Sequence, residues 1–343
     1  IACHVNPTGS AMRNSHGNDV VALEELPLER WTGTGDDNWD GYITDQLQIG
    51  GDIRMQGIQY NDTDNTQKTS FFPMQADIYS NLILNKNASI FTKVGVKGPG
   101  TISMEYWGLI NNLPKKAWLR VGRTFPNYGL RVDDHTSFIR GGNLGKTSVG
   151  LDKEGLLFTP YLDPPAILEL GVPISSKLEW TASIGTSLLY ITNPKKQELN
   201  NLSSKLTHRG SLGDNITYRM GMSYMKENNF NMAGISGGIS YGDFTWTFAL
   251  DQAENWVDDN TSLALYDELA WEIIQGIQLI GKYDFFDPKT EWTDGAVSRY
   301  TLGAEIYPLN IMEIKLQVRI NEVDMENATK KDPEYLIQTH LYF

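Results

Sequence analysis

The chain has 343 residues, of which 40% are hydrophobic, and its formal net charge is -13. No segment approaches the roughly 20 apolar residues that a membrane-spanning helix needs, so a helical membrane protein is excluded. The negative charge argues against nucleic acid as a partner, because its phosphates would be repelled. A transmembrane β-barrel stays compatible with the mean hydropathy of -0.35, since only every second residue of a barrel strand faces lipid.

Residues 1–43 show no strand pattern and are rich in Gly, Asn, Asp and Ser. They predict an irregular N-terminal segment ahead of a barrel over residues 44–343. The single cysteine, Cys3, is followed by His4. In the motif C-x-x-C-H, two cysteines form thioethers to a c-type haem and the histidine binds its iron. Residues 1–4 match the last four positions of this motif.

We therefore expect a cysteine immediately before Ile1, a longer natural N-terminus, and a covalent haem c held by Cys3 and His4. His16 is the candidate sixth ligand of the iron, because the surrounding Gly- and Asn-rich residues are flexible enough to fold back. Met12 is the alternative, since Met/His ligation occurs in cytochromes. Without haem, the Cys-His pair would be a chance occurrence, and the N-terminal segment would only plug the lumen.

A second motif in the N-terminal segment resembles a calcium-binding loop. Asp36, Asn38 and Asp40 are followed by Gly41 in the pattern D-x-N-x-D-G, which supplies oxygen ligands and a sharp turn. The twelfth position of such a loop should be acidic but is Leu47, so the match is incomplete. Calcium is one expectation, and a solvated acidic turn is the other.

Short alternating segments, separated by turn residues, follow from about residue 44 to the end of the chain. No helical pattern lies between them that would cover their apolar faces. Lipid is the simplest cover for those faces, and a water-filled lumen suits the charged faces. We predict an antiparallel transmembrane β-barrel of sixteen strands, although fourteen or eighteen would also fit. The predicted strands are 44–60, 69–84, 88–97, 101–110, 116–125, 154–172, 176–191, 203–212, 215–226, 229–241, 243–252, 261–273, 276–286, 298–308, 311–322 and 333–343.

The long connection over residues 126–153 is the main candidate for an internal loop. If it folds inward, it narrows the pore, and the alternative is a solvated external loop. The predicted pore-lining residues come from this connection and from the strand before it: Arg120, Arg131, Asp133, Asp134 and Arg140.

The final strand alternates up to Phe343, the last residue. A closing strand that ends on an aromatic residue resembles the C-terminal recognition signal of bacterial outer-membrane proteins. It predicts a barrel without a free edge in the bacterial outer membrane, surrounded by lipid.

The residues CHVNPTGSAMRN resemble the haem-bearing N-termini of porin-like barrels encoded beside multihaem c-type cytochromes. Residues 122–131 (GRTFPNYGLR) and 134–138 (DHTSF) resemble the same group. In that group the barrel is a sheath for an electron conduit through the outer membrane. This chain departs from the group in the missing first cysteine and in its smaller barrel.

Two functional hypotheses follow. The resemblance implies electron transfer across the outer membrane together with periplasmic or surface multihaem cytochromes. A general diffusion porin for small solutes, without haem, is the alternative. No nucleophile and base stand at a catalytic spacing, so we do not expect an enzyme.

Overall fold

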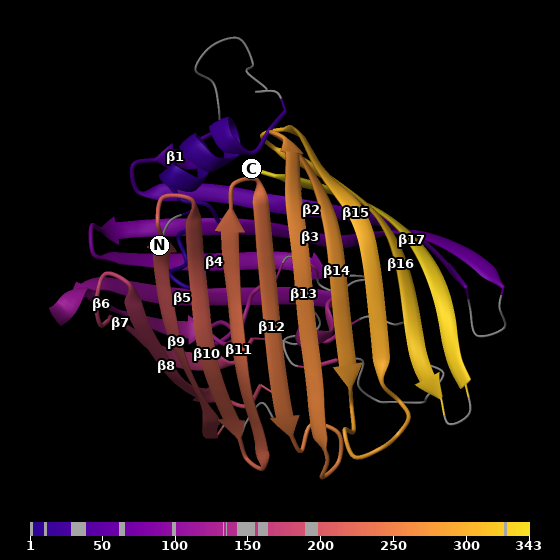
Figure 1. Cartoon of the computed structure of the whole chain (residues 1–343). Coiled ribbons are helices and arrows are strands. Elements are labelled where there is room, and N and C mark those ends of the chain that lie inside the picture. The colour runs from indigo at the N-terminus through magenta and orange to yellow at the C-terminus, as the bar shows by residue number, and fades with distance from the viewer. Residues whose placement is uncertain are drawn as a thin grey trace.

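The computed structural model describes residues 3–9, 12–28, 39–61, 66–97, 101–132, 134, 136–142, 155–156, 164–188, 198–325 and 328–343. Within these residues, sixteen strands, β2 to β17, form one antiparallel sheet that closes on itself where β17 pairs with β2 (Figure 1). A short strand, β1 (Tyr42–Thr44), pairs with the beginning of β2. No helix among the described residues is long and apolar enough to cross a membrane.

The barrel strands follow one another in chain order, and each pairs with its neighbours. Their bounds are β2 (Leu47–Asn61), β3 (Gln67–Asn85), β4 (Ala88–Lys97), β5 (Thr101–Leu113), β6 (Ala117–Arg123), β7 (Ala166–Pro173), β8 (Leu178–Thr186), β9 (Leu199–Leu212), β10 (Ile216–Glu227), β11 (Phe230–Tyr241), β12 (Phe244–Glu254), β13 (Thr261–Ile274), β14 (Ile277–Asp287), β15 (Val297–Leu309), β16 (Met312–Met325) and β17 (Ala328–Tyr342). Three short helices complete the described structure: η1 (Gly17–Glu25), η2 (Pro114–Lys116) and η3 (Phe138–Arg140).

The predicted sixteen-stranded barrel is confirmed, and each predicted strand overlaps one of the strands β2 to β17. The largest correction concerns the predicted strand 154–172. The observed strand β7 begins only at Ala166, directly after two prolines that have no N–H to donate to a strand ladder. In the predicted strand 176–191, β8 ends at Thr186, and residues 189–191 lie outside the described residues.

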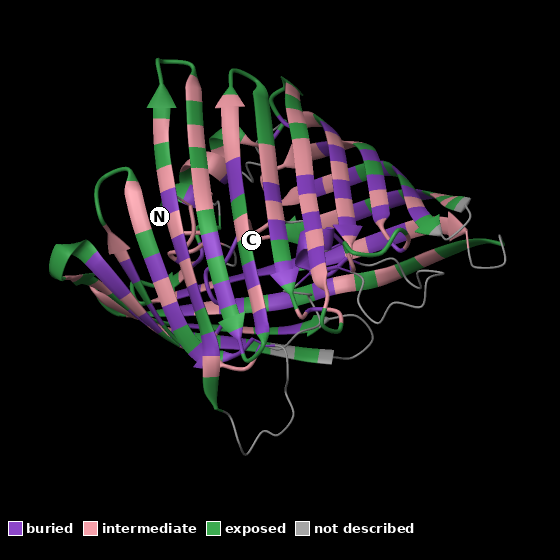
Figure 2. Ribbon diagram, turned by 60° about the horizontal axis from the view of Figure 1, so that its bottom comes forward, coloured by how far each residue is buried: buried purple, intermediate pink, exposed green. Residues whose placement is uncertain are grey.

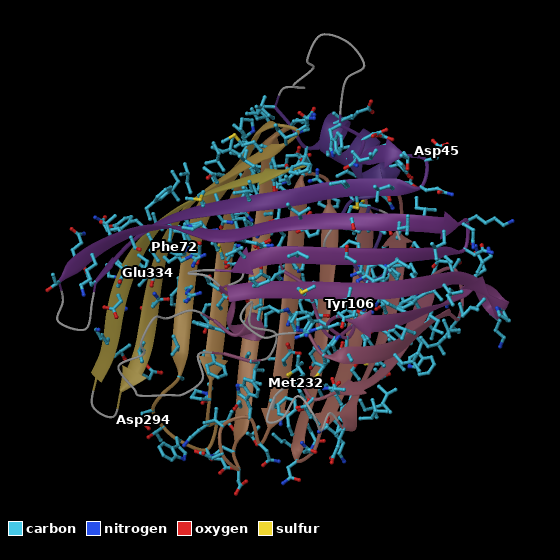
Figure 3. The ribbon with its side chains drawn as sticks, turned by 180° about the vertical axis from the view of Figure 1, so that it is seen from behind. Asp45, Phe72, Tyr106, Met232, Asp294 and Glu334 are labelled. Carbon is cyan, nitrogen blue, oxygen red and sulfur yellow. The ribbon has the colours of Figure 1, made fainter. Side chains whose placement is uncertain are left out.

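The two faces of the barrel wall differ in chemistry, as strand β16 illustrates. Leu316, Val318 and Ile320 are each more than 40% exposed on the outside, whereas Lys315 and Arg319 between them are buried on the lumen side. The same alternation of exposed and buried residues runs along most strands (Figure 2), and side chains project from both sides of the wall (Figure 3). The outer face is the apolar surface that lipid requires.

The connections between strands are all short at one end of the barrel. The long connections lie at the other end. Two-residue turns such as Lys86-Asn87 and Gly242-Asp243 lie at the first end, whereas β6 and β7 are joined at the second end by residues 124–165. Helix η1 and the C-terminus also lie at the short-turn end (Figure 1). In outer-membrane barrels, short turns face the periplasm. We therefore call this end the periplasmic end.

The junction between β17 and β2 is shorter than its neighbours. Strand β17 pairs with β16 along Ala328–Leu341 but with β2 only over Tyr335–Tyr342. At the periplasmic end, Phe343 exchanges two backbone hydrogen bonds of 3.1 Å with Gly51 of β2.

Candidate functional site

Two segments enter the lumen from opposite ends. The first is the N-terminal plug, residues 3–28, and the second is the inward loop, residues 124–142. The inward loop reaches the far wall of the barrel, where Tyr128 Oη donates to Asp251 Oδ1 of β12 at 2.9 Å. Ser137 Oγ donates to Asp284 Oδ1 of β14 at 3.0 Å. The loop therefore lies inside the barrel, as the inward alternative predicted, and not as a solvated external loop.

The N-terminal plug rests on an aromatic wall formed by Tyr79, Phe91 and Trp107 of three neighbouring strands. Their rings stack in sequence, with centroids 6.1 Å and 4.7 Å apart. Val5 and Met12 of the plug pack against this cluster, and Met12 is only 5% exposed. Apolar side chains on the lumen face of a porin-like barrel would otherwise meet water, so the aromatic wall gives the plug a hydrophobic seat.

Arg120 of β6 connects the plug, the inward loop and the barrel. Its Nη1 donates to Asn6 Oδ1 at 2.6 Å, and its Nη2 donates to Glu169 Oε1 at 2.7 Å. The same Nη2 donates to the Phe125 carbonyl at 3.2 Å. The Arg120 side chain is fully buried. One guanidinium thus fixes both segments that enter the lumen.

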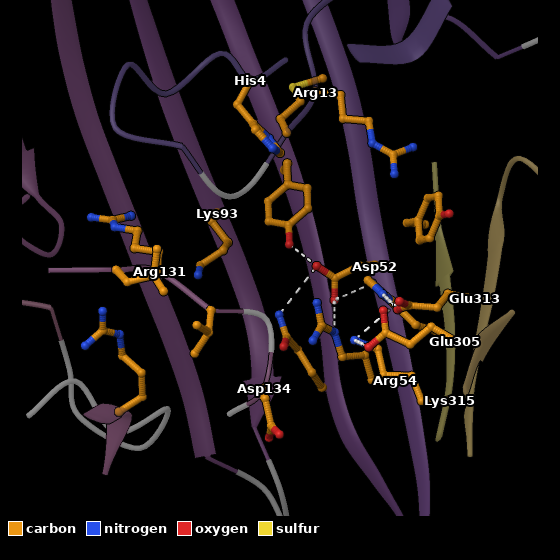
Figure 4. A pocket seen from close by; sticks show the side chains of 18 of the residues that line it. His4, Arg13, Asp52, Arg54, Lys93, Arg131, Asp134, Glu305, Glu313 and Lys315 are labelled. Carbon is orange, nitrogen blue, oxygen red and sulfur yellow. Dashed lines mark hydrogen bonds and ion pairs between the residues drawn. The ribbon is translucent and has the colours of Figure 1, made fainter. Parts of the chain in front are cut away.

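A cavity of about 680 Å³ lies between the plug and the inward loop. His4 and Arg13 line it from the plug, Arg131 from the loop, and Asp52 and Lys315 from the barrel (Figure 4). Charges of both signs line this cavity: Arg13, Arg54, Lys93, Arg131, Arg140, Lys282 and Lys315 are basic, and Asp52, Glu105, Asp134, Glu268, Glu305 and Glu313 are acidic.

Asp134 ties the inward loop to the wall electrostatically. Its Oδ2 lies 3.2 Å from Arg319 Nη2 and 3.6 Å from Lys282 Nζ. Burial alone would raise the pKa of the Asp134 carboxyl, but the two cations outweigh it and hold this pKa well below its usual range. The loop therefore carries a permanent negative charge at neutral pH.

The predicted pore-lining residues Arg131, Arg140 and Asp134 line the cavity, whereas Arg120 is buried in the wall and is not part of the lining. Asp133 lies outside the described residues. Of the predicted haem-binding residues, His4 lines the cavity. Its neighbour Cys3 is a half-buried free thiol outside that lining, and His16 is exposed just before η1.

The predicted calcium loop falls mostly outside the described residues, which include Asp40 but neither Asp36 nor Asn38. Asp40 Oδ1 accepts a hydrogen bond of 2.8 Å from the Tyr42 backbone N–H, and its carbonyl accepts one from Asn18 Nδ2. In the described parts of the chain, no three acidic, histidine or cysteine side chains are grouped as metal ligands. Calcium binding stays a prediction.

His340 of β17 is the site residue that the sequence did not reveal. Its Nδ1 lies 3.2 Å from Glu313 Oε2. Its Nε2 is buried, has no hydrogen-bond partner, and lies 4.0 Å from Asp52 Oδ1. The residue lines the cavity that also contains His4. Strand alternation predicted its face, but only the register of β16 and β17 shows that it stands opposite Glu313.

No protein-family model and no curated relative matches the sequence. The fold, in contrast, is shared with solved outer-membrane proteins. An anion-selective porin from Comamonas acidovorans is similar with a TM-score of 0.59 at 8% identity, over 87% of this chain and 99% of that one. OprB from Pseudomonas putida has a TM-score of 0.61 at 9% identity, over 87% and 94% of the two chains. The outer-membrane channel DcaP of Acinetobacter baumannii has a TM-score of 0.59 at 11% identity, over 87% and 97%.

The chain therefore has the fold of the bacterial outer-membrane porins. Its closed sheet and apolar outer face fit it to the outer membrane, where lipid surrounds the barrel.

Proposed function

We propose that the protein carries a covalent haem c at the periplasmic mouth of its barrel and works with multihaem c-type cytochromes in electron transfer across the outer membrane. The observation that carries this proposal is the position of His4, which lines the lumen cavity at the periplasmic end. A haem attached to Cys3 would thus be held at the mouth of the barrel and not on a free tail.

Two side chains of the plug that line the cavity would suit a haem. His4 supplies an imidazole for the iron, and Arg13 supplies a cation for the carboxylates of a porphyrin. When bound, the haem supplies reversible one-electron chemistry. The hydrocarbon core is about 30 Å thick, so one haem cannot cross it, and partner cytochromes must bring the others.

The test is production of the natural protein in cells that attach c-type haem. We expect a haem-stained band near the 38.6 kDa of the chain under denaturing conditions, and a reduced α-band typical of c-type haem. Cys3→Ser should remove the covalent stain, whereas His208→Ala should keep it. A colourless wild-type protein would overturn the proposal.

A second candidate is a diffusion channel for small charged solutes, and the observation that favours it is the inward loop above a cavity lined by charges of both signs. This function predicts that the haem-free protein conducts ions in planar bilayers. Conductance should rise when residues 3–28 are deleted, because the plug leaves the lumen while the barrel closure between β2 and β17 is retained. A protein that insulates the bilayer in both forms would exclude it.

A further inference from the structure

One region of the lumen wall is basic, although the chain as a whole carries a net charge of -13. Stretches of four neighbouring strands, β9 to β12, contain no acidic residue (Figure 1): 205–211, 217–223, 234–240 and 245–249. Lys205, Arg209 and Arg219 lie on the lumen face of this region. They follow the same alternation as Thr207 and Ser223, which are buried inside the barrel. We call the lumen face of these four stretches the basic wall.

Arg209 and Arg219 stand directly opposite each other on β9 and β10. Both are exposed, and within the described residues neither side chain has an ion pair or a hydrogen bond. Like charges directly opposite each other destabilise a pair of strands. A bound anion would remove this repulsion, because it can accept charge-assisted hydrogen bonds from both guanidinium groups.

Lys205 extends the positive charge further from the periplasmic end. Its side chain is only 7% exposed, and its Nζ donates to the Gly129 carbonyl of the inward loop. Arg219 acts on this ammonium group electrostatically, as do Arg131 and Arg140 of the loop, and Asp251 is the acid that opposes them. The inward loop therefore adds cations to the basic wall where it approaches β9.

Glycine leaves open space beside these cations. Gly238 of β11 pairs with Arg219 on one side and with Thr247 on the other. A Cβ atom at Gly238 would have its closest contact at 3.7 Å, so no side chain fills the space above this residue. Ser236 and Ser240 flank it on the same face of β11, and Thr247 also lines the large cavity. Arginine and hydroxyl donors around an open floor suit the oxygen atoms of phosphate and carboxylate groups.

Acidic side chains begin only on the strands that flank the basic wall. Glu179 of β8 stands opposite Thr207, and Glu268 of β13 stands opposite Thr247. Glu268 is paired with Lys282 at 2.9 Å, away from the two arginines. In the described part of the chain, no carboxylate thus neutralises Arg209 or Arg219 as an ion-pair partner.

We propose that the basic wall binds a small soluble oxyanion, a phosphate or a carboxylate, between Arg209, Arg219 and the hydroxyl groups around Gly238. The site lies in the periplasmic half of the lumen, because a short turn at the periplasmic end joins β9 to β10. It goes beyond the proposed function and needs no haem. Its failure would therefore leave the electron-transfer proposal standing, and the reverse also holds.

The test is isothermal titration of the natural protein in detergent micelles, at constant ionic strength, with inorganic phosphate and separately with succinate. We expect saturable binding, and the anion that binds more tightly identifies the ligand as a phosphate or a carboxylate. Arg219→Ala should weaken this binding about tenfold or more, because a hydrogen bond to a charged group is lost. Arg219→Lys should keep part of the affinity, since the charge stays but the planar fork of donors is removed.

Gly238→Val separates a built site from a general positive potential. It keeps every charge of the wall and fills the floor beside Arg219, so anion binding should be lost. The matched control is Lys226→Ala, which removes an exposed cation from the opposite face of β10 and should bind like the wild type. A wild-type protein that binds neither anion would overturn the site. Unchanged affinity in Arg219→Ala or in Gly238→Val would overturn it equally.

Discussion

The two segments that enter the lumen differ in how far ion pairs hold them. The N-terminal plug lies on the aromatic wall and places Val5 and Met12 in apolar contact with it. The inward loop packs apolar side chains such as Phe138 against the far wall, and the ion pair of Asp134 with Arg319 adds to this contact. Apolar contact has little directional preference, whereas charge pairs fix position and respond to salt and pH. The loop should therefore respond to pH more than the plug does.

Arg120→Ala should have the largest effect, because Arg120 contacts both segments. Removing one partner of a buried ion pair costs about 3–5 kcal/mol, since Glu169 would keep a buried charge without its cation. We expect this loss in the free energy of unfolding measured in urea with detergent micelles. Arg209→Ala, at an exposed position of β9, is the control and should change little. Equal stabilities of the two variants would contradict the role of Arg120.

Trp107→Ala should act mainly on the plug. Truncation of a buried Trp costs about 3–5 kcal/mol, and here it removes the ring that stacks on Phe91. The same ring lies 5.7 Å from the Arg120 guanidinium, so we expect a smaller effect on the inward loop. Limited proteolysis should accelerate more for the N-terminal plug than for the inward loop. Trp271→Ala removes an exposed Trp of the outer face and serves as the control. An equal increase in cleavage of both segments would contradict this expectation.

Asp134→Asn should act on the loop alone and cost about 1–3 kcal/mol, because the charged partners of the carboxylate stay in place. A carboxyl whose pKa is lowered on folding contributes stability above its unfolded pKa and loses it as the pH falls through the folded value. Loop protection against proteases should thus persist at neutral pH and decline in strong acid, below the usual range of Asp. In Asp134→Asn this acid transition should weaken, and an identical transition would refute the assignment.

Arg13→Ala should have the smallest effect, about 0.5–1 kcal/mol for a cation–π contact that is only half-buried, here with Tyr342. It should modestly increase proteolysis of the plug. Arg13→Lys should retain part of the protection, and a loss as large as that of Trp107→Ala would mean that charge, not apolar contact, seats the plug.

The barrel could be predicted from the sequence because its signal is local and repeats. In β16 the alternation of Leu316 and Val318 with Lys315 and Gln317 indicates which face contacts lipid. Turn residues indicate where each strand ends. The strand 154–172 was predicted to include Pro164 and Pro165 because the surrounding residues are apolar, although a proline has no N–H to donate to a strand ladder.

The site could be predicted only in part, because it depends on distances between segments far apart in the chain. Cys3 and His4 are recognisable as neighbours in a motif. His4 and His340 line the same cavity, but this depends on barrel closure and on the fold of the plug. The position of His340 opposite Glu313 depends on the register of β16 and β17. The role of Arg120 was equally hidden, since its partner Asn6 is more than a hundred residues away.

The short junction between β2 and β17 has a mechanical consequence. Strand β17 pairs with β2 only over Tyr335–Tyr342, so fewer hydrogen bonds resist separation there than along β16. Under denaturant or a pulling force, β17 should therefore separate from β2 before it separates from β16. Backbone amides of residues 52–59 should accordingly exchange with deuterium earlier than those in the middle of β12 or β13.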